Sequence, residues 1–342
     1  MLRRGIERFT YSLANQLAHD YDMHIVIYTW KSRDAIDWGK WEKNIHIRQM
    51  PFSRYFQHYF SKIFYRIWLM IDRPKKILIN FLYHGENSLP KDMEYYYILH
   101  SPASQVPHRY HFIKNHIHKF KNISFIAVSQ FVMKEAEPFI NKLSIKVIYN
   151  GVDTKYFSPN GVPTNNSDLA IVTLSALERR KGIQNVITAI IKMNDPKIRY
   201  NIYGDRPYKQ EIIKMINSSN LQDKITLHPS NEDPAQCLNN SDVYMLLSKG
   251  EALPLGPLEA MACGLPVIVS DHPPYDEFVH SDIGFKVNRN STDSISEAIY
   301  EMKILANRSQ LGAAGRKMVE KSFMWKHVAN QYYKTMYSDY NV

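Results

Sequence analysis

Short apolar runs alternate with amphipathic segments along most of the chain. The runs have the length, the β-branched content and the polar boundaries of buried strands, and they occupy residues 24–30, 45–50, 95–99, 123–128, 145–149, 169–175, 200–204, 223–228, 242–248 and 266–270. Between them lie helical patterns, as in residues 5–18, where Phe9, Leu13 and Leu17 share one face. Alternating strands and helices predict parallel sheets covered by helices, so we expect an α/β fold.

The length and composition agree with two globular domains. The chain has 342 residues, of which 44% are hydrophobic and 22% are charged. This is enough for two α/β domains of ordinary size. Residues 160–167 (NGVPTNNS) have the composition of a linker.

The stretch from Glu251 to Gly264 is the most informative part of the chain. It follows one predicted strand and precedes another, and we expect a tight loop and a short helix in between. Pro257 suits the first helical position and Gly264 suits the helix end. This order places Glu251 in a loop at the carboxyl end of the sheet and Glu259 in the first turn of the helix.

Such a helix start is a place where anions bind. Backbone N–H groups around Gly256, Pro257 and Leu258 would point outward at the positive end of the helix dipole. Glu251 and Glu259 would flank this site, which suits a ligand with hydroxyl groups on both sides of a phosphate, such as a nucleotide sugar. The alternative is an ordinary strand–helix–strand crossover whose two glutamates are solvated.

The spacing of these glutamates resembles a known family. Seven residues separate Glu251 from Glu259, and the run LEAMACGLPVI follows. The pattern resembles the signature of retaining glycosyltransferase family 4, the group 1 glycosyltransferases of GT-B fold. The resemblance implies two Rossmann-like domains facing each other across a cleft, with Glu251 on the donor sugar and Glu259 on the nucleotide ribose. Ala252 departs from the family, which usually has glycine there.

Other family positions match in part. Lys181 and Gly182 fit the Arg-x-x-x-x-Lys-Gly motif whose cations meet the donor diphosphate, but Ala176 stands at the arginine position. Either Arg179 or Arg180 could compensate, since a guanidinium can pair with two phosphate oxygens. A solvated basic turn is the alternative.

The resemblance also extends to the first half of the chain. His100 follows a strand where the family carries a histidine that faces the donor sugar, although a histidine after a strand can also be a plain loop residue. Gly5 corresponds to the second glycine of a loop that approaches the diphosphate.

The resemblance divides the chain into three parts. Residues 1–155 would form an N-terminal, acceptor-side Rossmann-like domain, and residues 156–322 a nucleotide-sugar-binding one. Residues 323–342 would form a helix that crosses back to the first domain. The loop at Gly5 normally follows a central first strand, which four residues cannot supply, so we expect a truncated or mis-started chain.

Charge is concentrated in the first half. Residues 1–160 carry a net charge of +10 and the rest carry none. Residues 54–71 predict a helix whose basic stripe and dense aromatics suit an anionic membrane surface. A core-packing helix with a solvated basic back explains the pattern equally well. No helix-turn-helix, zinc-finger or RNA-binding signature is present, so no nucleic-acid partner is expected.

The remaining features concern metals and location. The two cysteines, Cys237 and Cys263, lack metal-ligand spacing, which favours a reduced, cytoplasmic setting. No apolar run reaches the length of a membrane span, so we expect peripheral association with the cytoplasmic face of a membrane. Asp20-Tyr21-Asp22 matches an Asp-x-Asp metal motif but lies before a strand, as a turn would. No cofactor and no metal are expected, because the resemblance assigns the diphosphate charge to side chains.

The resemblance implies transfer of a sugar from a nucleoside diphosphate sugar to a glycan or lipid-linked acceptor, with retained anomeric configuration, in cell-envelope glycan or glycolipid synthesis. Two alternatives remain. A nucleotide-sugar epimerase of similar fold would act on the donor without an acceptor. A catalytically weakened binding subunit at the membrane would bind nucleotide or lipid and turn over nothing, as Ala176 and Ala252 would permit.

Overall fold

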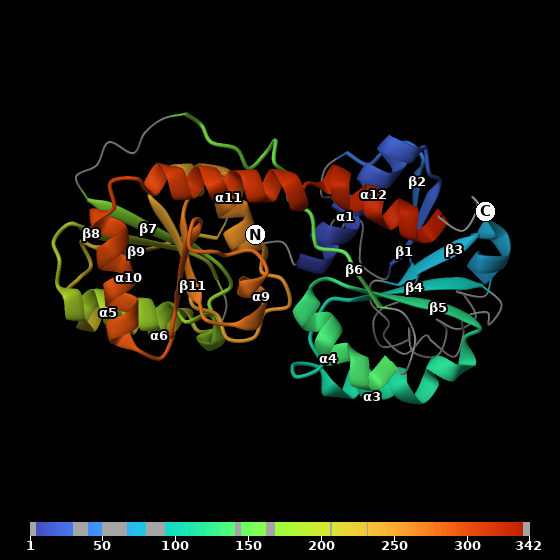
Figure 1. The fold of residues 1–342 in the computed structure, drawn as a ribbon, viewed down its shortest axis with the longest axis horizontal. Helices are drawn as coiled ribbons and strands as arrows, with labels where there is room; N and C mark the ends of the chain where they lie inside the picture. The colour runs from blue at the N-terminus through green and yellow to red at the C-terminus, as the bar shows by residue number, and fades with distance from the viewer. Residues whose placement is uncertain are drawn as a thin grey trace. The chain divides into compact units, whose positions relative to one another are not determined.

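The structure is a computed structural model, and it describes residues 5–29, 40–49, 67–79, 93–140, 145–161, 168–205, 207–230 and 232–337. The chain divides into two compact units (Figure 1). Val152–Met324 forms the C-terminal unit. Arg4–Gly151 forms the N-terminal unit together with Trp325–Val342.

The C-terminal unit is built on one parallel sheet with the strand order β12-β11-β10-β7-β8-β9. Its strands are β7 (Leu169–Leu174), β8 (Ile198–Tyr203), β9 (Ile225–His228), β10 (Val243–Leu246), β11 (Val267–Ser270) and β12 (Gly284–Val287). Its helices are η4 (Arg179–Lys181), α5 (Ile183–Met193), α6 (Lys209–Ser218), α7 (Pro234–Asn239), α8 (Leu255–Ala262), α9 (Pro273–Asp276), α10 (Thr292–Ile304) and α11 (Arg308–Ser322).

Helices cover both faces of this sheet. Buried residues of α5, α6 and α10 form one core with inward-facing residues of the strands, such as Ile171, Tyr200 and Met245. Helices α8 and α11 pack against each other, and in Figure 1 α11 runs along the side of the sheet opposite to α5 and α6. Strands buried on both faces explain why their sequences read as continuous apolar runs.

The strand order fixes where a ligand can bind. Strand β7 is the first strand of the unit, and the chain runs outward from it to β8 and β9 before it returns to β10 on the other side. The loops that follow β7 and β10 therefore leave the sheet in opposite directions. Open parallel sheets bind ligands at this switch point, outside the carboxyl ends of the strands.

The N-terminal unit contains two parallel sheets. One pairs β1 (Ile25–Thr29) with β2 (Ile45–Gln49). The other has the order β3-β4-β5-β6, formed by β3 (Lys76–Ile79), β4 (Glu94–Leu99), β5 (Asn122–Ala127) and β6 (Ile145–Val147). No described strand joins the two sheets. The helices of this unit are α1 (Gly5–Tyr21), α3 (Pro107–His116), η3 (Ile117–Lys119), α4 (Gln130–Ile140) and α12 (Trp325–Tyr337).

The last helix packs on the first one. Phe9 of α1 is buried and lies edge-on to Trp325 and Tyr332 of α12, with ring centroids 5.6 and 6.0 Å apart. Tyr21 and Tyr333 stack with their ring centroids 4.0 Å apart. The apolar face predicted for residues 5–18 is therefore confirmed, because Phe9, Leu13 and Leu17 are all buried.

The predicted α/β class with two Rossmann-like units is confirmed, with corrections to individual elements. The sequence pattern missed β3 and β12, which are only four residues long and contain lysine. Of the helix predicted over residues 54–71, residues 67–72 are helical and residues 54–66 lie outside the described part of the chain. Among the described helices, none combines the length and apolarity needed to cross a bilayer.

Candidate functional site

The site forms where the loops after β7 and β10 meet. Lys181 ends η4, directly after the β7 loop, and Glu251 lies in the loop between β10 and α8. The Lys181 Nζ atom donates to Glu251 Oε1 at 2.6 Å, and both side chains are only 13% exposed. The two loops are thus joined by a largely buried ion pair.

The same carboxylate oxygen accepts two further hydrogen bonds. Arg180 Nη1 lies 3.2 Å from Glu251 Oε1, and the hydroxyl of Ser248 donates to that oxygen as well. Burial alone would raise the pKa of Glu251, but Lys181, Ser248 and Arg180 outweigh it and hold the pKa below its ordinary value. Glu251 is therefore an anion at neutral pH. Its second oxygen, Oε2, accepts no hydrogen bond from the residues that the structure describes.

Backbone contacts fix these loops against each other. Gly182 has φ +75°, and a Cβ atom there would lie 2.2 Å from the carbonyl oxygen of Leu247. Arg289, from the loop after β12, donates from Nε to the Leu247 oxygen at 2.9 Å and from Nη2 to the Arg180 oxygen at 3.4 Å. The Lys249 N–H donates to the same Arg180 oxygen at 2.8 Å. The positions of the Lys181 ammonium and the Glu251 carboxylate are therefore set by three loops.

A histidine supports the Glu251 backbone. The N–H of Glu251 donates to Nε2 of His272 at 3.3 Å, so this ring nitrogen carries no proton. His272 precedes α9 in the loop after β11. Sequence reasoning missed Ser248, His272 and Arg289 as site residues. Ser248 could have been found, because it lies at the end of a predicted strand. Arg289 could not, because it follows β12, a strand that the hydrophobic pattern did not predict.

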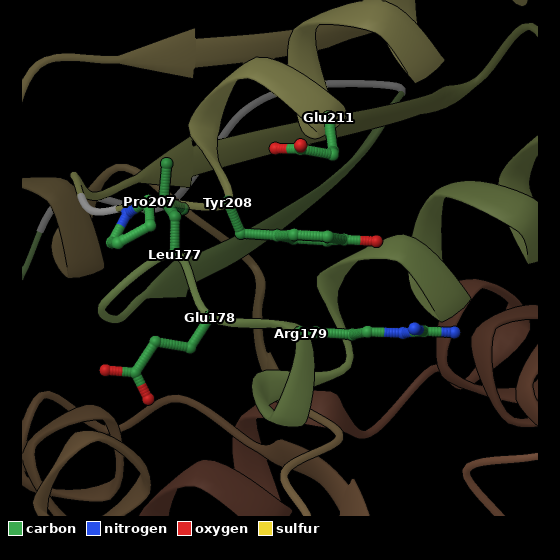
Figure 2. A pocket seen from close by; sticks show the side chains of 6 residues that line it. All are labelled: Leu177, Glu178, Arg179, Pro207, Tyr208 and Glu211. Carbon is green, nitrogen blue, oxygen red and sulfur yellow. The ribbon is translucent and has the colours of Figure 1, made fainter.

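The side chains of Arg179 and Arg180, in the loop after β7, have different neighbours. Arg180 bonds Glu251, the carbonyl of Gly250 and the carboxylate of Glu178. Arg179 instead lines a pocket of about 370 Å³ that also includes Leu177, Glu178, Pro207, Tyr208 and Glu211. Figure 2 shows the Arg179 side chain extended in the same direction as the Tyr208 ring. Of the two candidates, Arg180 is the one placed with Glu251.

Helix α8 begins two residues earlier than the sequence predicted. It starts at Leu255, so Pro257 occupies the third helical position and contributes no N–H. Proline is tolerated there because the N–H groups of the first turn have no partner within the helix. The amides of Leu255 and Gly256 remain as donors without a partner within the helix, whereas Leu258 is the fourth helical residue, at which the N–H bonds of the helix begin. The predicted helix end at Gly264 is confirmed by its φ of +80°.

Gly256 and Glu259, two predicted site residues on α8, both have close neighbours within the C-terminal unit. A Cβ atom on Gly256 would lie 2.2 Å from the hydroxyl of Tyr244, so glycine is required there for packing alone. Glu259 is half-buried on α8, and its charge helps burial to raise the pKa of the Cys263 thiol to about 12. Their predicted contacts with a donor stay predictions.

His100 and Gly5 belong to the N-terminal unit. His100 directly follows β4, and its ring lies edge-on to Phe9 with centroids 4.8 Å apart. Burial, assisted by the nearby charge of Arg109, lowers the pKa of His100 to about 4. The ring is therefore neutral at physiological pH. Gly5 is the first residue of α1. Within the described ranges, no three histidine, cysteine, aspartate or glutamate side chains gather as a metal site would require.

Comparison with known proteins adds three findings. Residues 157–318 match the family described as glycosyl transferases group 1. N-acetyl-alpha-D-glucosaminyl L-malate synthase of Bacillus anthracis is 25% identical over 225 residues, 62% of this chain and 58% of that protein. GDP-mannose:cellobiosyl-diphosphopolyprenol alpha-mannosyltransferase of Xanthomonas oryzae pv. oryzae is 29% identical over 201 residues, 55% of this chain and 51% of that protein. The chain thus spans about half the length of these curated relatives.

The fold as a whole is shared with solved structures. Anabaena HepE, solved in complex with UDP and glucose, superposes with a TM-score of 0.80 at 18% identity, over 98% of this chain and 96% of that one. At this level of identity the likeness concerns the fold alone, which is the GT-B fold that the family resemblance implied.

Proposed function

Residues 157–318 match the group 1 glycosyl transferases, and from that premise we propose that the chain transfers a sugar from a nucleoside diphosphate sugar to an acceptor hydroxyl. We assign retention of anomeric configuration to this transfer and place it in the synthesis of a cell-envelope glycan or glycolipid. HepE binds UDP and glucose, and the Xanthomonas relative is named for a GDP-mannose donor, so UDP and GDP sugars are the first donors to test.

The observation that carries the proposal is the charge arrangement at the switch point. Lys181 and Arg180 meet the carboxylate of Glu251 there, and the first turn of α8 follows in the same loop. Negative charge develops on the departing diphosphate during sugar transfer, so fixed cations and helix amides that meet it lower the barrier. Side chains, and no metal ion, supply this charge in the proposed reaction.

In this proposal, Glu251, Glu259 and His100 bind the sugar and nucleotide parts of the donor. Glu251 orients the donor sugar through Oε2, which accepts no hydrogen bond from the described residues. Glu259 binds the ribose, and the neutral ring of His100 contacts the sugar. Gly5 leaves room for the diphosphate beside α1.

A membrane surface is the proposed location of the acceptor. Ile67, Met70 and Ile71 form an apolar patch on the helical residues 67–72, with 40, 66 and 63% of their surfaces exposed. Arg73 and Lys75 are exposed directly after this patch, whereas Lys62 and Arg66 lie outside the described residues. Exposed apolar and basic side chains together suit the headgroup region of an anionic bilayer. We therefore propose peripheral association with the cytoplasmic face.

A donor screen tests the proposal. UDP, GDP and ADP sugars are added separately to the protein in the presence of EDTA, and the shift of the thermal unfolding midpoint is measured. We expect one nucleotide class to stabilise the protein and its sugar to be released or transferred.

Binding without turnover, with or without acceptor lipid, would indicate the catalytically weakened binding subunit. Conversion of the donor alone to an isomeric nucleotide sugar would indicate an epimerase. Loss of turnover in EDTA, restored by a divalent metal, would contradict the metal-independent assignment.

A further inference from the structure

The cations assigned to the diphosphate already have a counter-ion within the protein. Lys181 Nζ has Glu251 Oε1 as its hydrogen-bond partner and no other among the described residues. Arg180 shares the same oxygen through Nη1. A diphosphate that approaches this loop therefore meets cations whose charge is partly neutralised.

Because Lys181 and Glu251 are largely buried, each strongly neutralises the charge of the other. The side chains of Lys181 and Glu251 are each 13% exposed, and their charged atoms are 2.6 Å apart. Solvent screens such a pair poorly, and removal of one partner leaves the other as an uncompensated, largely buried charge. A diphosphate must therefore compete with Glu251 for the ammonium group.

A second ion pair in the same loop provides a comparison. Glu178 Oε2 lies 2.7 Å from Arg180 Nε, but the side chains of Glu178 and Arg180 are 37% and 45% exposed. The Glu178 carboxylate forms no ion pair with the Lys181 ammonium among the described residues, and the two residues are joined only by the backbone, where the Lys181 N–H donates to the Glu178 carbonyl at 2.9 Å. Solvent screens this pair well, so its loss would change the local potential little.

We propose that Glu251 is an internal competitor of the donor diphosphate, which makes the site discriminate between a nucleotide sugar and the free nucleoside diphosphate. The proposal rests on the function proposed above. When an intact donor binds, the sugar hydroxyls donate to Glu251 while the diphosphate takes Lys181 and Arg180. A nucleoside diphosphate without sugar has no sugar hydroxyl to donate to Glu251. The ion pair between Glu251 and Lys181 therefore persists and weakens the binding of that nucleotide. Glu251 thereby favours entry of the donor and departure of the product.

The test is calorimetric titration of the full chain with UDP, GDP and ADP, and with inorganic pyrophosphate as a ligand that has no base. Glu251→Gln keeps the size of the side chain and removes its charge. We expect this variant to bind the preferred nucleoside diphosphate and pyrophosphate about tenfold more tightly than the unchanged protein, a difference of about 1.4 kcal/mol. Lys181→Met should bind both ligands more weakly. Glu178→Gln, the matched control, should bind as the unchanged protein does.

A second variant covers the case in which Glu251→Gln does not fold. Glu251→Asp keeps the charge but withdraws it by one methylene from Lys181, and it should strengthen nucleoside diphosphate binding to a smaller extent. Unchanged or weaker binding in the folded Glu251 variants, while the unchanged protein binds nucleoside diphosphate, would overturn the competitor role alone. Absence of binding in the unchanged protein and in every variant would overturn the proposed function, and this inference with it.

Discussion

Of the two guanidinium groups that follow β7, the one on Arg180 turns toward Glu251 and the one on Arg179 lines a separate pocket. The family arginine is absent at Ala176, so the proposed function needs another cation for the diphosphate. We propose Arg180 for this role, because its side chain already reaches the loop in which Glu251 lies.

This assignment gives a prediction at the residue scale. Arg180→Met should weaken nucleoside diphosphate sugar binding about tenfold, since a hydrogen bond to a charged group contributes about 1.5–3 kcal/mol. Arg179→Met removes the same charge from the chain and should change binding less than twofold. Titration of both variants with the preferred donor measures the difference. Equal losses would mean that the net charge of the loop matters and the position of the guanidinium does not.

His100 gives a second prediction at this scale. Its folded-state pKa is about 4, below the ordinary 6.5, so the unfolded chain binds the proton more readily in between. The contribution of His100 to stability is unchanged above pH 6.5, becomes more unfavourable as the pH falls to about 4, and then levels off. Glu251 acts in the same direction at more acid pH, because its pKa is also lowered in the folded state and its stabilising contribution is lost as the pH falls below the ordinary value of 4.5.

Urea unfolding of the unchanged protein and of His100→Gln measures this effect. The stability of the unchanged protein relative to the variant should decline between pH 6.5 and pH 4. A constant difference across this range would show that His100 is not desolvated in the folded state.

At the scale of elements, the β7 loop is held by a backbone contact as well as by ions. Gly182→Ala would place a Cβ atom 2.2 Å from the Leu247 carbonyl in a left-handed conformation. Gly161 is the matched control, since it has a similar φ of +72° and no atom of the described residues within 4 Å of an added Cβ. Gly161→Ala should reduce the free energy of unfolding by about 1 kcal/mol through backbone strain alone. Gly182→Ala should reduce it more and should also weaken donor binding, as denaturant titration and calorimetry would show. Equal effects would exclude the close approach to Leu247.

The elements show which parts of the site a sequence can reveal. The place of Glu251 in a loop at the edge of the sheet was predictable from the apolar runs on either side of it, and Lys181 was predictable from its resemblance to the family motif. His272 and Arg289 were not, because their approach to Glu251 and Leu247 depends on the order of β10, β11 and β12 in space. The start of α8 was misplaced because Pro257 fits the third helical position as well as the first.

At the scale of the whole molecule, basic charge and the exposed apolar patch occur in the N-terminal unit. The sequence indicated a basic, aromatic helix there but could not separate a core-packing helix from a surface one. Leu69 is buried while Ile67, Met70 and Ile71 are exposed, so the described turn has both an inner and an outer apolar side. Periodicity alone does not distinguish these two sides.

Vesicle binding tests the proposed role of this patch. Vesicles with anionic lipid should bind the protein, and binding should weaken as salt rises, because exposed charges are screened within about 8–10 Å. A variant with Met70→Ser, Ile71→Ser, Arg73→Gln and Lys75→Gln should bind much less. Ile304→Ser, at an apolar residue that is 60% exposed in the other unit, is the control and should bind normally. Equal sedimentation with neutral and anionic vesicles would reject the membrane-surface role.

The central claim, that Lys181 meets the diphosphate of a sugar donor, is tested most directly by the rate of sugar transfer in Lys181→Met. The donor is the nucleotide sugar identified by thermal shift, and the transferred sugar is followed together with its anomeric configuration. Loss of one fixed cation at the leaving group removes about 3 kcal/mol, so the rate should fall on the order of 100-fold in a protein that remains folded. Lys249→Met, an exposed lysine beside the same loop, should transfer at the normal rate. Near-normal transfer by the folded Lys181→Met variant would contradict the account.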